Sequence, residues 1–434
     1  MPGLEQKIRD GSATVGIVGL GYVGLPLAVT FAQAGFKVLG FDIRQGNVDS
    51  VNRGESYIAD VSHESLSAVV TARLLEATTD QGRLGEADAI CICVPTPLTA
   101  TRDPDLSYVI QESEEIAQRL RPGQLVVLES TTYPGTTRGI ILPRLESSGL
   151  RCGTDFYLAY SPERVDPGSS EYNVKNTPTI VGGIDAESTR LARLLYSRIV
   201  DNVLTVSCPE AAAMTKVFEN VFRSVNIALV NELAHLCERM GISVWEVIDS
   251  ASTKPFGYMP FYPGPGVGGH CIPLDPYYLA NKAREFDFHT RFIELAAEIN
   301  EHMPYHVVSR ITDALNARGR SVKDARILVI GVAYKRDVAD TRESPALKII
   351  QLLQEKGAHV SYNDPYVSRL TLPAGDMESM PLSGERLAAA DCVVIATDHG
   401  CHDYADVVAR AKLVFDTRGV TRGLPGDNIA RLGE

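Results

Sequence analysis

The stretch TVGIVGLGYVGLPLAVTFAQAGFKVLGFD, residues 14–42, decides the fold of the first part of the chain. It reads as a short apolar strand that ends in glycines, a helix that stops at Gly35, and a second strand that ends at Asp42. Strand–helix–strand units of this kind build parallel, doubly wound sheets. Within the stretch, GLGYVG (19–24) matches GxGxxG, and Asp42 follows the last of these glycines by eighteen residues. This spacing in this context is typical of a dinucleotide-binding turn.

The glycines have separate roles: Gly19 allows the tight turn, Gly21 lets the backbone approach a pyrophosphate, and Gly24 permits close packing of helix on strand. The N–H groups at the start of the helix then face the phosphates. The carboxylate of Asp42 would accept hydrogen bonds from ribose hydroxyls and repel a 2′-phosphate, which favours NAD over NADP, although Arg44 weakens that preference. The alternative is a glycine-rich turn without a ligand. The predicted cofactor-binding residues are Gly19, Gly21, Tyr22, Val23, Gly24, Asp42, Arg44, Pro95, Thr96 and Thr132.

The rest of the chain continues as strands and helices, with one long helical interruption. Apolar runs alternate with helical segments in the first 200 residues and again after Lys323. Between them, residues 209–239 carry helical periodicity up to Gly241, and residues 252–276 are dense in Pro and Gly, as in a loop. The expected strands are 14–18, 37–42, 88–94, 124–130, 156–161, 326–331, 359–364, 391–397 and 412–419, and the expected helices are 25–34, 107–121, 209–239, 291–318 and 346–357.

This pattern predicts an α/β fold with two Rossmann-like doubly wound domains, joined by a long central helix and a helical dimerisation domain. We expect an NAD-binding domain at 1–205, a central helical domain at 206–318, and a second Rossmann-like domain at 319–434. A helix of about thirty residues does not fit inside a small α/β unit. It is therefore expected to pack against a second copy, which predicts a homodimer or a higher homo-oligomer.

Composition excludes several classes of protein. The chain has 434 residues, of which 44% are hydrophobic and 22% charged, so a disordered chain is not expected. A net charge of -12 argues against nucleic acid or an anionic membrane as the main partner. No apolar run approaches the length of a spanning helix, and the first dozen residues do not resemble a secretory signal. Eight scattered cysteines without a CxxC pair favour a reduced, cytoplasmic protein.

Two segments outside the cofactor motif hold groups suited to chemistry. Cys271 lies in GPGVGGHCIPLDP (264–276), where glycines allow a ligand close to the backbone, and Asp275 follows it. Lys216 and Asn220 are four apart on the long helix, so they share a face, and a cation beside an amide can stabilise an oxyanion. The alternatives are an incidental thiol and a solvated helix face.

Two more segments follow apolar strands at the carboxyl ends, where ligands of doubly wound sheets bind. Thr131 lies in ESTTYPGT (129–136) and Glu163 in YSPERVDPG (160–168). These residues are candidates to order a water molecule or the nicotinamide, and the alternative is strand-end capping.

A metal site is not expected. His302 and His306 are four apart on a helix, but no third ligand is apparent, which favours a solvated or packed pair. His270 neighbours Cys271 in sequence, and we interpret it as structural.

Six pieces of sequence occur in the order and spacing of the UDP-glucose/GDP-mannose dehydrogenase family, the nucleotide-sugar 6-dehydrogenases, and the resemblance covers nearly the whole chain. The segment STKPFGYMPFYPGPGVGGHCIP (252–273) resembles the corresponding segment of the branch that oxidises UDP-N-acetylhexosamines, UDP-N-acetylglucosamine in particular. UDP-glucose and UDP-N-acetylmannosamine are the alternative substrates. The six pieces are GLGYVGLPLA (19–28), ESTTYPGTT (129–137), SPERVDPG (161–168), Lys216 with Asn220, GGHCIPLDP (268–276) and GVAYKRDVADTRESPA (331–346).

The resemblance implies an NAD-dependent, four-electron oxidation of the sugar C6 hydroxymethyl group to a uronate, through a thiohemiacetal and a thioester on Cys271. By motif, the polar companions of this nucleophile are Lys216, Asn220 and Asp275, while Thr131 and Glu163 position water. The family implies a role in polysaccharide biosynthesis and a C-terminal domain that binds the UDP-sugar. The implied substrate-binding residues are Arg164, Lys216, Asn220, Lys254, Gly268, Lys335 and Arg418.

One position departs from the family pattern. Many UDP-glucose enzymes carry an arginine before the GGxC loop that reaches the sugar of the partner subunit, whereas Lys254 is the nearest cation here. Two other functions remain as alternatives: a two-electron hydroxyacid dehydrogenase, which would not need Cys271, and a non-catalytic NAD-binding protein.

Overall fold

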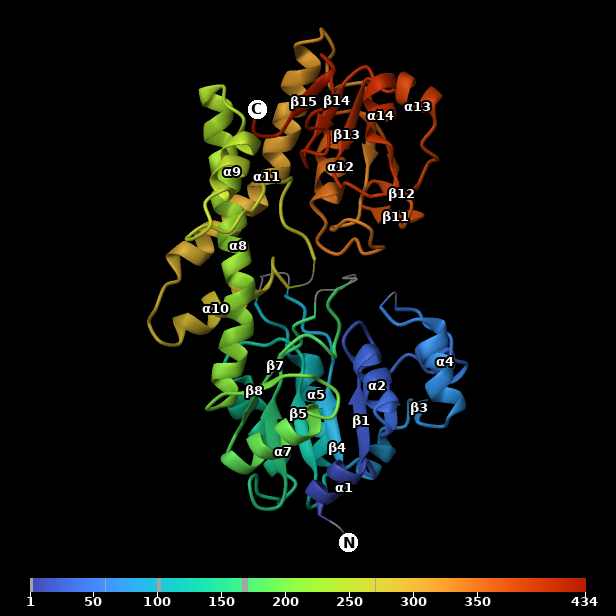
Figure 1. Ribbon diagram of the computed structural model, residues 1–434, viewed down its shortest axis with the longest axis vertical. Helices are drawn as coiled ribbons and strands as arrows, with labels where there is room; N and C mark the ends of the chain where they lie inside the picture. The colour runs from blue at the N-terminus through green and yellow to red at the C-terminus, as the bar shows by residue number, and fades with distance from the viewer. Residues whose placement is uncertain (1–2, 59, 100–102, 166–170, 270) are drawn as a thin grey trace. The chain divides into compact units, whose positions relative to one another are not determined.

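The computed structural model describes residues 3–58, 60–99, 103–165, 171–269 and 271–434 (Figure 1). The chain forms two compact units. Unit 1 consists of residues 1–219 and 277–288, and unit 2 consists of residues 220–276 and 289–434.

Unit 1 is built on an eight-stranded sheet in the order β3-β2-β1-β4-β5-β6-β7-β8. Neighbouring strands are parallel except for β6 and β7, which are antiparallel. The strand order reverses between β1 and β4, and ligands of doubly wound sheets bind at this switch point. The strands are β1 (Thr14–Val18), β2 (Lys37–Phe41), β3 (Leu75–Thr78), β4 (Ala89–Ile92), β5 (Leu125–Leu128), β6 (Tyr157–Tyr160), β7 (Thr179–Gly183) and β8 (Val203–Thr205).

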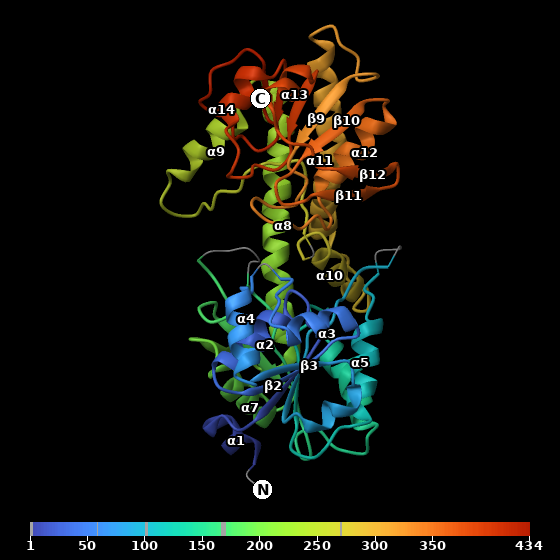
Figure 2. The same cartoon turned by 90° about the vertical axis from the view of Figure 1, so that its right-hand side faces the viewer.

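Helices cover both faces of this sheet. The central strands β4 and β5 are buried along their whole length, as expected for continuous apolar runs in a covered parallel sheet. Figure 2 shows α2 and α7 on one side and α5 on the other, and each side has its own apolar cluster. The helices are α1 (Leu4–Asp10), α2 (Gly24–Gln33), α3 (Gln45–Asn52), α4 (His63–Thr71), α5 (Ser107–Ala117), α6 (Leu142–Glu146) and α7 (Ala186–Tyr196), with a 3₁₀ turn at Gln81–Glu86 and a π-turn at Thr137–Ile141.

The predicted long helix is α8, Pro209–Met240, with 32 residues. It ends directly before Gly241, as the sequence predicts, and it contributes residues to both units. The helices that follow it are α9 (Val244–Ser252), α10 (Asp275–Arg284) and α11 (Arg291–Asn316). The loop expected over 252–276 is confirmed for its described residues between α9 and α10, except that Ser252 still belongs to α9 and that Asp275 and Pro276 already belong to α10.

Unit 2 contains a five-stranded, fully parallel sheet in the order β10-β9-β13-β14-β15, and a separate antiparallel pair, β11 and β12. The four predicted strands of this region are confirmed, whereas β15 and the β11–β12 pair were not predicted. The elements are β9 (Arg326–Ile330), β10 (His359–Asn363), β11 (Arg369–Leu372), β12 (Gly375–Glu378), β13 (Cys392–Ile395), β14 (Val414–Asp416), β15 (Ile429–Arg431), α12 (Pro345–Glu355), α13 (Gly384–Ala389) and α14 (Tyr404–Arg410).

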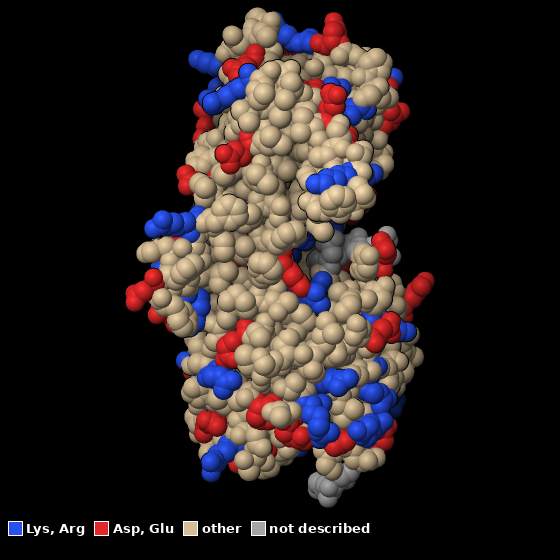
Figure 3. Space-filling model, turned by 60° about the vertical axis from the view of Figure 1, so that its left-hand side comes forward, with Lys and Arg blue, Asp and Glu red and all other residues tan. Residues whose placement is uncertain are grey.

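The predicted fold class, α/β with two Rossmann-like doubly wound domains, is confirmed. The exact domain boundaries at 205/206 and 318/319 stay predictions. In unit 2, large apolar side chains of α8 remain exposed, and the side of unit 2 turned to the viewer in Figure 3 has wide areas without charged side chains. Among the described residues, the structure contains no helix with an apolar stretch long enough to cross a bilayer.

Candidate active site

The turn between β1 and α2 contains three glycines. Packing leaves no room for a side chain at two of them, whereas the third lies in open space. Gly19 has φ +91°, and a Cβ there would lie 2.7 Å from the carbonyl oxygen of Cys93. A Cβ on Gly24 would lie 1.8 Å from the oxygen of Gly19, whereas nothing lies within 4 Å of a Cβ on Gly21. The backbone at Gly21 is therefore open, as the close approach of a pyrophosphate requires.

Asp42 follows β2 beside this turn and is held in place by three donors. Its Oδ2 accepts the N–H of Leu20 at 3.1 Å and the amide of Asn47 at 3.2 Å, and its Oδ1 accepts the N–H of Arg44 at 2.8 Å. A carboxylate has about four acceptor sites, so Asp42 retains capacity for a ribose hydroxyl. The backbone of Arg44, rather than its side chain, makes the contact to Asp42. Tyr22 and Val23 complete the turn, and the Tyr22 side chain is exposed.

The segments after β4 and β5 are joined by hydrogen bonds. The hydroxyl of Thr96 donates to the carbonyl oxygen of Thr131 at 2.7 Å, and the hydroxyl of Tyr278 donates to the carbonyl oxygen of Thr96. Thr132 is buried, and among the described residues its Oγ1 has no hydrogen-bond partner. The carboxyl ends of two neighbouring strands thus bring together three predicted residues, Thr96, Thr131 and Thr132. A fourth predicted residue, Pro95, directly precedes Thr96. The fit of this crevice to a dinucleotide rests on the open Gly21, the fixed Asp42 and this unused hydroxyl.

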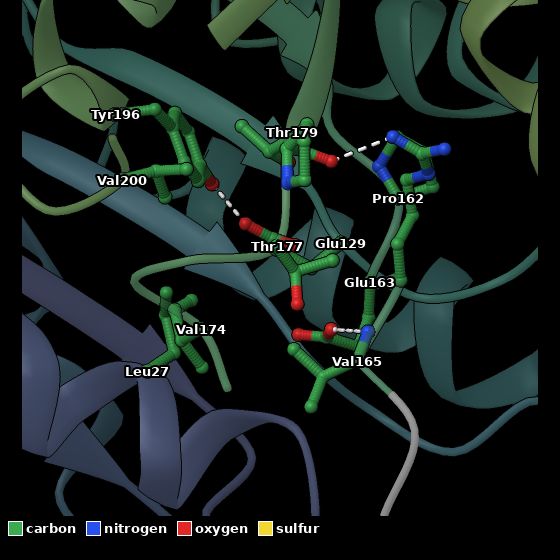
Figure 4. A pocket seen from close by; sticks show the side chains of 12 residues that line it. Leu27, Glu129, Pro162, Glu163, Val165, Val174, Thr177, Thr179, Tyr196 and Val200 are labelled. Carbon is green, nitrogen blue, oxygen red and sulfur yellow. Dashed lines mark hydrogen bonds between the residues drawn. The ribbon is translucent and has the colours of Figure 1, made fainter. Parts of the chain in front are cut away.

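Glu163 lines a small pocket of unit 1 that also contains a buried carboxyl group, Glu129 (Figure 4). The backbone N–H of Val165 donates to Oε1 of Glu163. Glu129 is 3% exposed, and the hydroxyl of Tyr196 donates to its Oε1. Burial raises the pKa of Glu129 well above its ordinary value, and the nearby charge of Glu163 raises it further. Burial against Tyr196 and beside Glu163 thus favours the protonated form of Glu129.

Arg164 is largely engaged within unit 1. Its Nε and Nη2 donate to the carboxylate of Glu219 at 3.2 and 2.6 Å, and its Nη1 donates to the carbonyl oxygen of Pro178 at 2.6 Å. Three of its five N–H donors are therefore used. A substrate contact, as predicted for Arg164, has to use the remaining two.

Lys216 and Asn220 lie one turn apart on α8, as predicted. The side chain of Lys216, in unit 1, is 8% exposed, and its ammonium has no hydrogen-bond or ion-pair partner within the described part of the chain. In unit 2, Nδ2 of Asn220 donates to Oδ2 of Asp275 at 2.5 Å, and both side chains are buried. The structure thus brings together one predicted pair of polar groups, Asn220 and Asp275.

Cys271 is tied to the start of the helix that carries Asp275. Its carbonyl oxygen accepts the N–H of Leu274 at 3.1 Å and the N–H of Asp275 at 2.9 Å, and Cys271 is partly exposed. Further back in the loop, the side chain of Asn231 on α8 accepts the N–H of Gly264 at 3.0 Å, and the carbonyl oxygen of Arg342 accepts the N–H of Gly269 at 3.0 Å. The loop is therefore fixed to α8 and to the segment that follows β9.

Four more of the residues predicted to bind the nucleotide sugar lie in unit 2. Lys335 is partly exposed in the loop after β9, and Arg418 follows β14 with its Nε donating to the carbonyl oxygen of Ala396 at 2.8 Å. Both lie at carboxyl ends of strands, where ligands of doubly wound sheets bind. Gly268 packs in the cysteine loop, and Lys254 is exposed after α9 with its ammonium 5.0 Å from the centre of the Phe256 ring.

Models of three consecutive domains match the chain. They are the NAD binding domain at residues 13–200, the central domain at 210–302 and the UDP binding domain at 328–423 of the UDP-glucose/GDP-mannose dehydrogenase family. The chain belongs to the UDP-glucose/GDP-mannose dehydrogenase family. It is an NAD-dependent UDP-sugar dehydrogenase, an oxidoreductase, so the predicted family, enzyme class and cofactor are confirmed.

Individual relatives in the family are similar along most of their length. UDP-N-acetyl-D-mannosamine dehydrogenase of Pyrococcus horikoshii is 39% identical over 96% of this chain and 98% of its own. UDP-N-acetyl-D-glucosamine 6-dehydrogenase of Pseudomonas aeruginosa is 39% identical over 82% of this chain and 83% of its own. A solved structure of a UDP-D-ManNAc dehydrogenase from Pyrococcus horikoshii has a TM-score of 0.89 at 35% identity, covering 97% of this chain and 99% of the other.

The histidines considered for a metal have other partners in this family member. Nε2 of His306 lies 2.9 Å from the carboxylate of Glu238, and Nδ1 of His302 lies 2.9 Å from the carbonyl oxygen of Glu298. Among the described residues no group of three His, Cys, Asp or Glu side chains is arranged to hold a metal ion. His270 lies outside the described residues.

Sequence reasoning missed three residues that shape the candidate site: Glu129, Asn231 and Tyr334. Asn231 has a signal in the sequence, because it is a polar residue on the buried side of a long helix. Glu129 and Tyr334 stand next to predicted motif residues, in ESTTYPGT and in AYKRD, but their importance comes from contacts with distant segments that spacing does not reveal.

Proposed function

We propose that this family member oxidises the C6 hydroxymethyl group of a UDP-2-acetamido sugar to the uronate, in four electrons, through a thiohemiacetal and a thioester on Cys271. The proposal is carried by the contact between Asn220 and Asp275 at the start of the helix to which Cys271 is hydrogen-bonded. The sequence favours UDP-N-acetylglucosamine. UDP-N-acetylmannosamine is the second candidate, because the UDP-N-acetyl-D-mannosamine dehydrogenase of Pyrococcus horikoshii matches along more of this chain than the UDP-N-acetyl-D-glucosamine 6-dehydrogenase does.

The need for a thiol follows from the second oxidation. The first oxidation gives an aldehyde, and loss of hydride from an aldehyde would leave an unstable acylium ion. Addition of the Cys271 thiolate to the carbonyl carbon gives a tetrahedral species whose oxyanion can expel the hydride and form a thioester. Bound NAD supplies the hydride acceptor for both oxidations. Water then cleaves the thioester, which releases the carboxylate and restores the thiol.

The polar residues divide the remaining work. Asn220 uses one N–H of its amide on Asp275 and has a second for an oxyanion. The buried cation of Lys216 stabilises the same charge, and such groups contribute about 3 kcal/mol each. Asp275 and Glu163 are the general bases that take the proton of the alcohol or of water, directly or through water, and Thr131 helps to hold the hydrolytic water.

The binding roles follow from the strand ends described above. The NAD site is proposed to consist of the β1–α2 turn with Asp42 and Arg44, and of Pro95, Thr96 and Thr132. The cations of Lys335 and Arg418 are proposed to bind the diphosphate of the nucleotide sugar. The proposed sugar-binding set is completed by Arg164, Lys216, Asn220, Lys254 and Gly268.

We also propose that the enzyme is a homodimer formed through α8. In unit 2, Phe222, Leu229 and Leu236 of this helix are spaced by seven residues and are exposed. Phe222 and Leu229 line a hollow of about 430 Å³ together with Tyr258 and Met259. An apolar stripe on one helix matches the same stripe of a second copy about a two-fold axis. Light scattering on the wild type and on Leu229→Glu tests this, and a wild-type monomer would contradict it.

The nucleophile is tested by Cys271→Ser, with Cys401→Ser as the matched control. Cys401 is an exposed cysteine of the same unit with no role in the proposed site. Because serine is a much poorer nucleophile at neutral pH, we expect Cys271→Ser to lose uronate formation by at least about a thousandfold and Cys401→Ser to retain it. Uronate is measured by mass spectrometry, with two NADH formed per sugar in the wild type. Unchanged uronate formation in Cys271→Ser would contradict the mechanism.

The substrate is tested with a panel of UDP-glucose, UDP-N-acetylglucosamine and UDP-N-acetylmannosamine. We expect kcat/KM for one of the acetamido sugars to exceed that for UDP-glucose by at least about tenfold, a typical difference for a group that fills its pocket. A higher kcat/KM for UDP-glucose would replace the acetamido assignment without affecting the family.

A further inference from the structure

Tyr334 connects the loop that carries Lys335 with the loop that carries Cys271. It lies directly before Lys335 in the segment after β9 and packs against two glycines of the cysteine loop. A Cβ on Gly268 would lie 2.6 Å from Cβ of Tyr334, and a Cβ on Gly269 would lie 3.0 Å from Cε2 of its ring. Cys271 follows only two residues after Gly269. Tyr334 thus leaves no room for a side chain at Gly268, which faces its Cβ, and little room at Gly269, which faces its ring.

The segment before Tyr334 is fixed and cannot swing independently. Oδ2 of Asp364 accepts the N–H groups of Val332 at 2.7 Å and Ala333 at 3.1 Å. The hydroxyl of Thr397 donates to the carbonyl oxygen of Ala333 at 2.6 Å. These bonds hold the start of the loop to the ends of β10 and β13.

The segment after Lys335 is fixed as well. The backbone N–H of Asp337 donates to Nδ1 of His399 at 3.0 Å, and its Oδ1 accepts the N–H of Gly400 at 2.8 Å. Asp337 has φ +59°, a conformation that residues other than glycine rarely adopt and that persists only where the surroundings impose it. If Lys335 is displaced, only the few residues between these fixed segments can move with it, and Tyr334 is one of them.

We propose that Tyr334 is a positioning residue whose Cβ seats Gly268 and whose ring seats Gly269, so that a nucleotide bound at Lys335 and the placement of Cys271 influence each other through these contacts. The inference rests on the proposed function, in which Lys335 binds the nucleotide sugar and Cys271 is the nucleophile. A close-packed contact transmits small shifts because its atoms cannot be compressed. The second tie between the loops, from the N–H of Gly269 to the carbonyl oxygen of Arg342, keeps them in register.

The two directions of this influence are thermodynamically linked. If bound nucleotide shifts the equilibrium between two placements of the Cys271 loop by some factor, then the placement of the loop changes nucleotide affinity by the same factor. The ring of Tyr334 provides the contact surface, so a ring without the hydroxyl preserves the link. A side chain without a ring breaks it, because Gly269 then faces a gap and loses its packing partner.

The test follows the alkylation of Cys271 by iodoacetamide, quantified by peptide mass spectrometry, in full-length enzyme with and without UDP. We compare the wild type, Tyr334→Phe and Tyr334→Ala, with Tyr305→Ala as a control at an exposed tyrosine of the same unit. In the wild type and in Tyr334→Phe we expect UDP to change the alkylation rate by at least about fivefold, the lower end of ordinary coupling between sites. In Tyr334→Ala we expect this ratio to fall close to one while calorimetry still detects UDP binding.

Steady-state kinetics gives a second readout that a general loss of stability would not produce. We expect Tyr334→Ala to lower kcat by about tenfold to a hundredfold, since a misplacement near 1 Å has that cost. KM for the UDP-sugar should change much less than kcat, and Tyr334→Phe should restore kcat. Tyr334→Leu, which fills more of the gap, replaces the alanine variant if the latter does not fold.

The outcomes separate this inference from the proposed function. If Tyr334→Ala or Tyr334→Leu retains both the wild-type kcat and the UDP effect on alkylation, Tyr334 is not a positioning residue. If the wild type binds UDP and requires Cys271 for turnover, but UDP leaves the alkylation rate unchanged, the coupling is wrong and the proposed function stands. If Cys271→Ser still forms uronate, the proposed function is wrong, and the coupling falls with it.

Discussion

The first strands of the two parallel sheets are followed by a glycine of the same backbone type, but the segments beyond it differ in kind. Gly19 after β1 has φ +91°, and Gly331 after β9 has φ +79°, where a Cβ would lie 2.4 Å from the carbonyl oxygen of Thr397. In unit 1 the helix begins at Gly24, the fifth residue after Gly19, so its N–H groups lie directly behind the turn. In unit 2, α12 begins only at Pro345, and the intervening loop supplies Tyr334 and Lys335 instead.

The acidic residue after the second strand differs in the same way. Asp42 accepts three hydrogen bonds and is half-buried, which leaves capacity for a ribose. Asp364, after β10, accepts five: four from backbone N–H groups, among them those of Val332 and Ala333, and one from Nε2 of His399 at 3.0 Å. One acid is available to a ligand, and the other holds the protein's own loop. A strand, a glycine turn and an acid therefore indicate a dinucleotide site only where the acid is not already saturated.

The comparison is tested most strongly by substituting Asn for each of the two acids. In Asp364→Asn the new NH2 group must face backbone N–H donors, which leaves buried groups unpaired. We expect unit 2 to lose about 3–5 kcal/mol of stability, the usual cost of breaking a buried charged network. Trp245 is the single tryptophan and lies in unit 2, so its fluorescence during urea unfolding reports this loss.

Asp42→Asn is the matched variant for unit 1. Because Asp42 is half-buried and water can reach its partners, we expect this variant to lose less stability than Asp364→Asn, as followed by circular dichroism during urea unfolding. NAD affinity by calorimetry should fall by at least about tenfold through the loss of a charge-assisted hydrogen bond. Equal losses of stability in the two variants would mean that the acids have the same structural role, and the contrast between the two units would be wrong.

A smaller effect is expected from alanine at two glycines of the β1–α2 turn. Gly19→Ala forces a left-handed residue and a clash with the oxygen of Cys93, which together cost about 2–4 kcal/mol of stability. Gly21→Ala adds a methyl group in open space, so it should leave thermal unfolding by circular dichroism unchanged and weaken NAD binding. A destabilised Gly21→Ala with intact NAD affinity would contradict the roles given to the two glycines.

Local sequence patterns predicted most of the strands around the residues that these experiments change. The runs at 14–18 and 37–42 are β1 and β2 within a residue, because apolar strands between glycine and charged turns have few other conformations. Most of the missed strands are short and lie at sheet edges or outside the main sheets: β8 has three residues, and β11 pairs with β12 alone. The missed strand β7 is different, because it lies between β6 and β8 and is mostly buried. Edge strands are partly exposed, so their apolar pattern is weak.

The site was predictable in parts only. Residues after apolar strands, such as Thr131, were expected at the crevice because carboxyl ends of parallel strands share one edge. The engagement of Arg164 by Glu219 and the burial of Glu129 against Tyr196 join segments more than fifty residues apart, and no local pattern encodes such pairs. The saturation of Asp364 could not be inferred either, because its donors come from three separate loops.

Glu129 and Asp364 are both buried carboxyl groups at strand ends, but their pKa values are shifted in opposite directions. Burial raises the pKa of both, but at Asp364 the hydrogen bonds from His399 and from backbone N–H groups outweigh it and bring the pKa below its ordinary 3.8. At Glu129 burial and the charge of Glu163 prevail, so the pKa lies well above its ordinary 4.5. Folded wild type therefore retains a proton on Glu129 that the unfolded chain releases above about pH 4.5.

The sign of the effect follows from this proton. Stability from a carboxyl group with a raised pKa is complete below its unfolded pKa and is lost as pH rises towards the folded pKa, so the wild type weakens as pH rises above about 4.5. Glu129→Gln has no such proton and keeps an oxygen for the hydroxyl of Tyr196, so its melting temperature should rise above the wild type's as pH increases. The difference in melting temperature between the wild type and Asp364→Asn should stay constant over the same range, because Asp364 is ionised throughout in both the folded and the unfolded chain. If the melting temperatures of Glu129→Gln and wild type changed in parallel with pH, Glu129 would be ionised in the folded protein. The two carboxyl groups would then not have opposite pKa shifts.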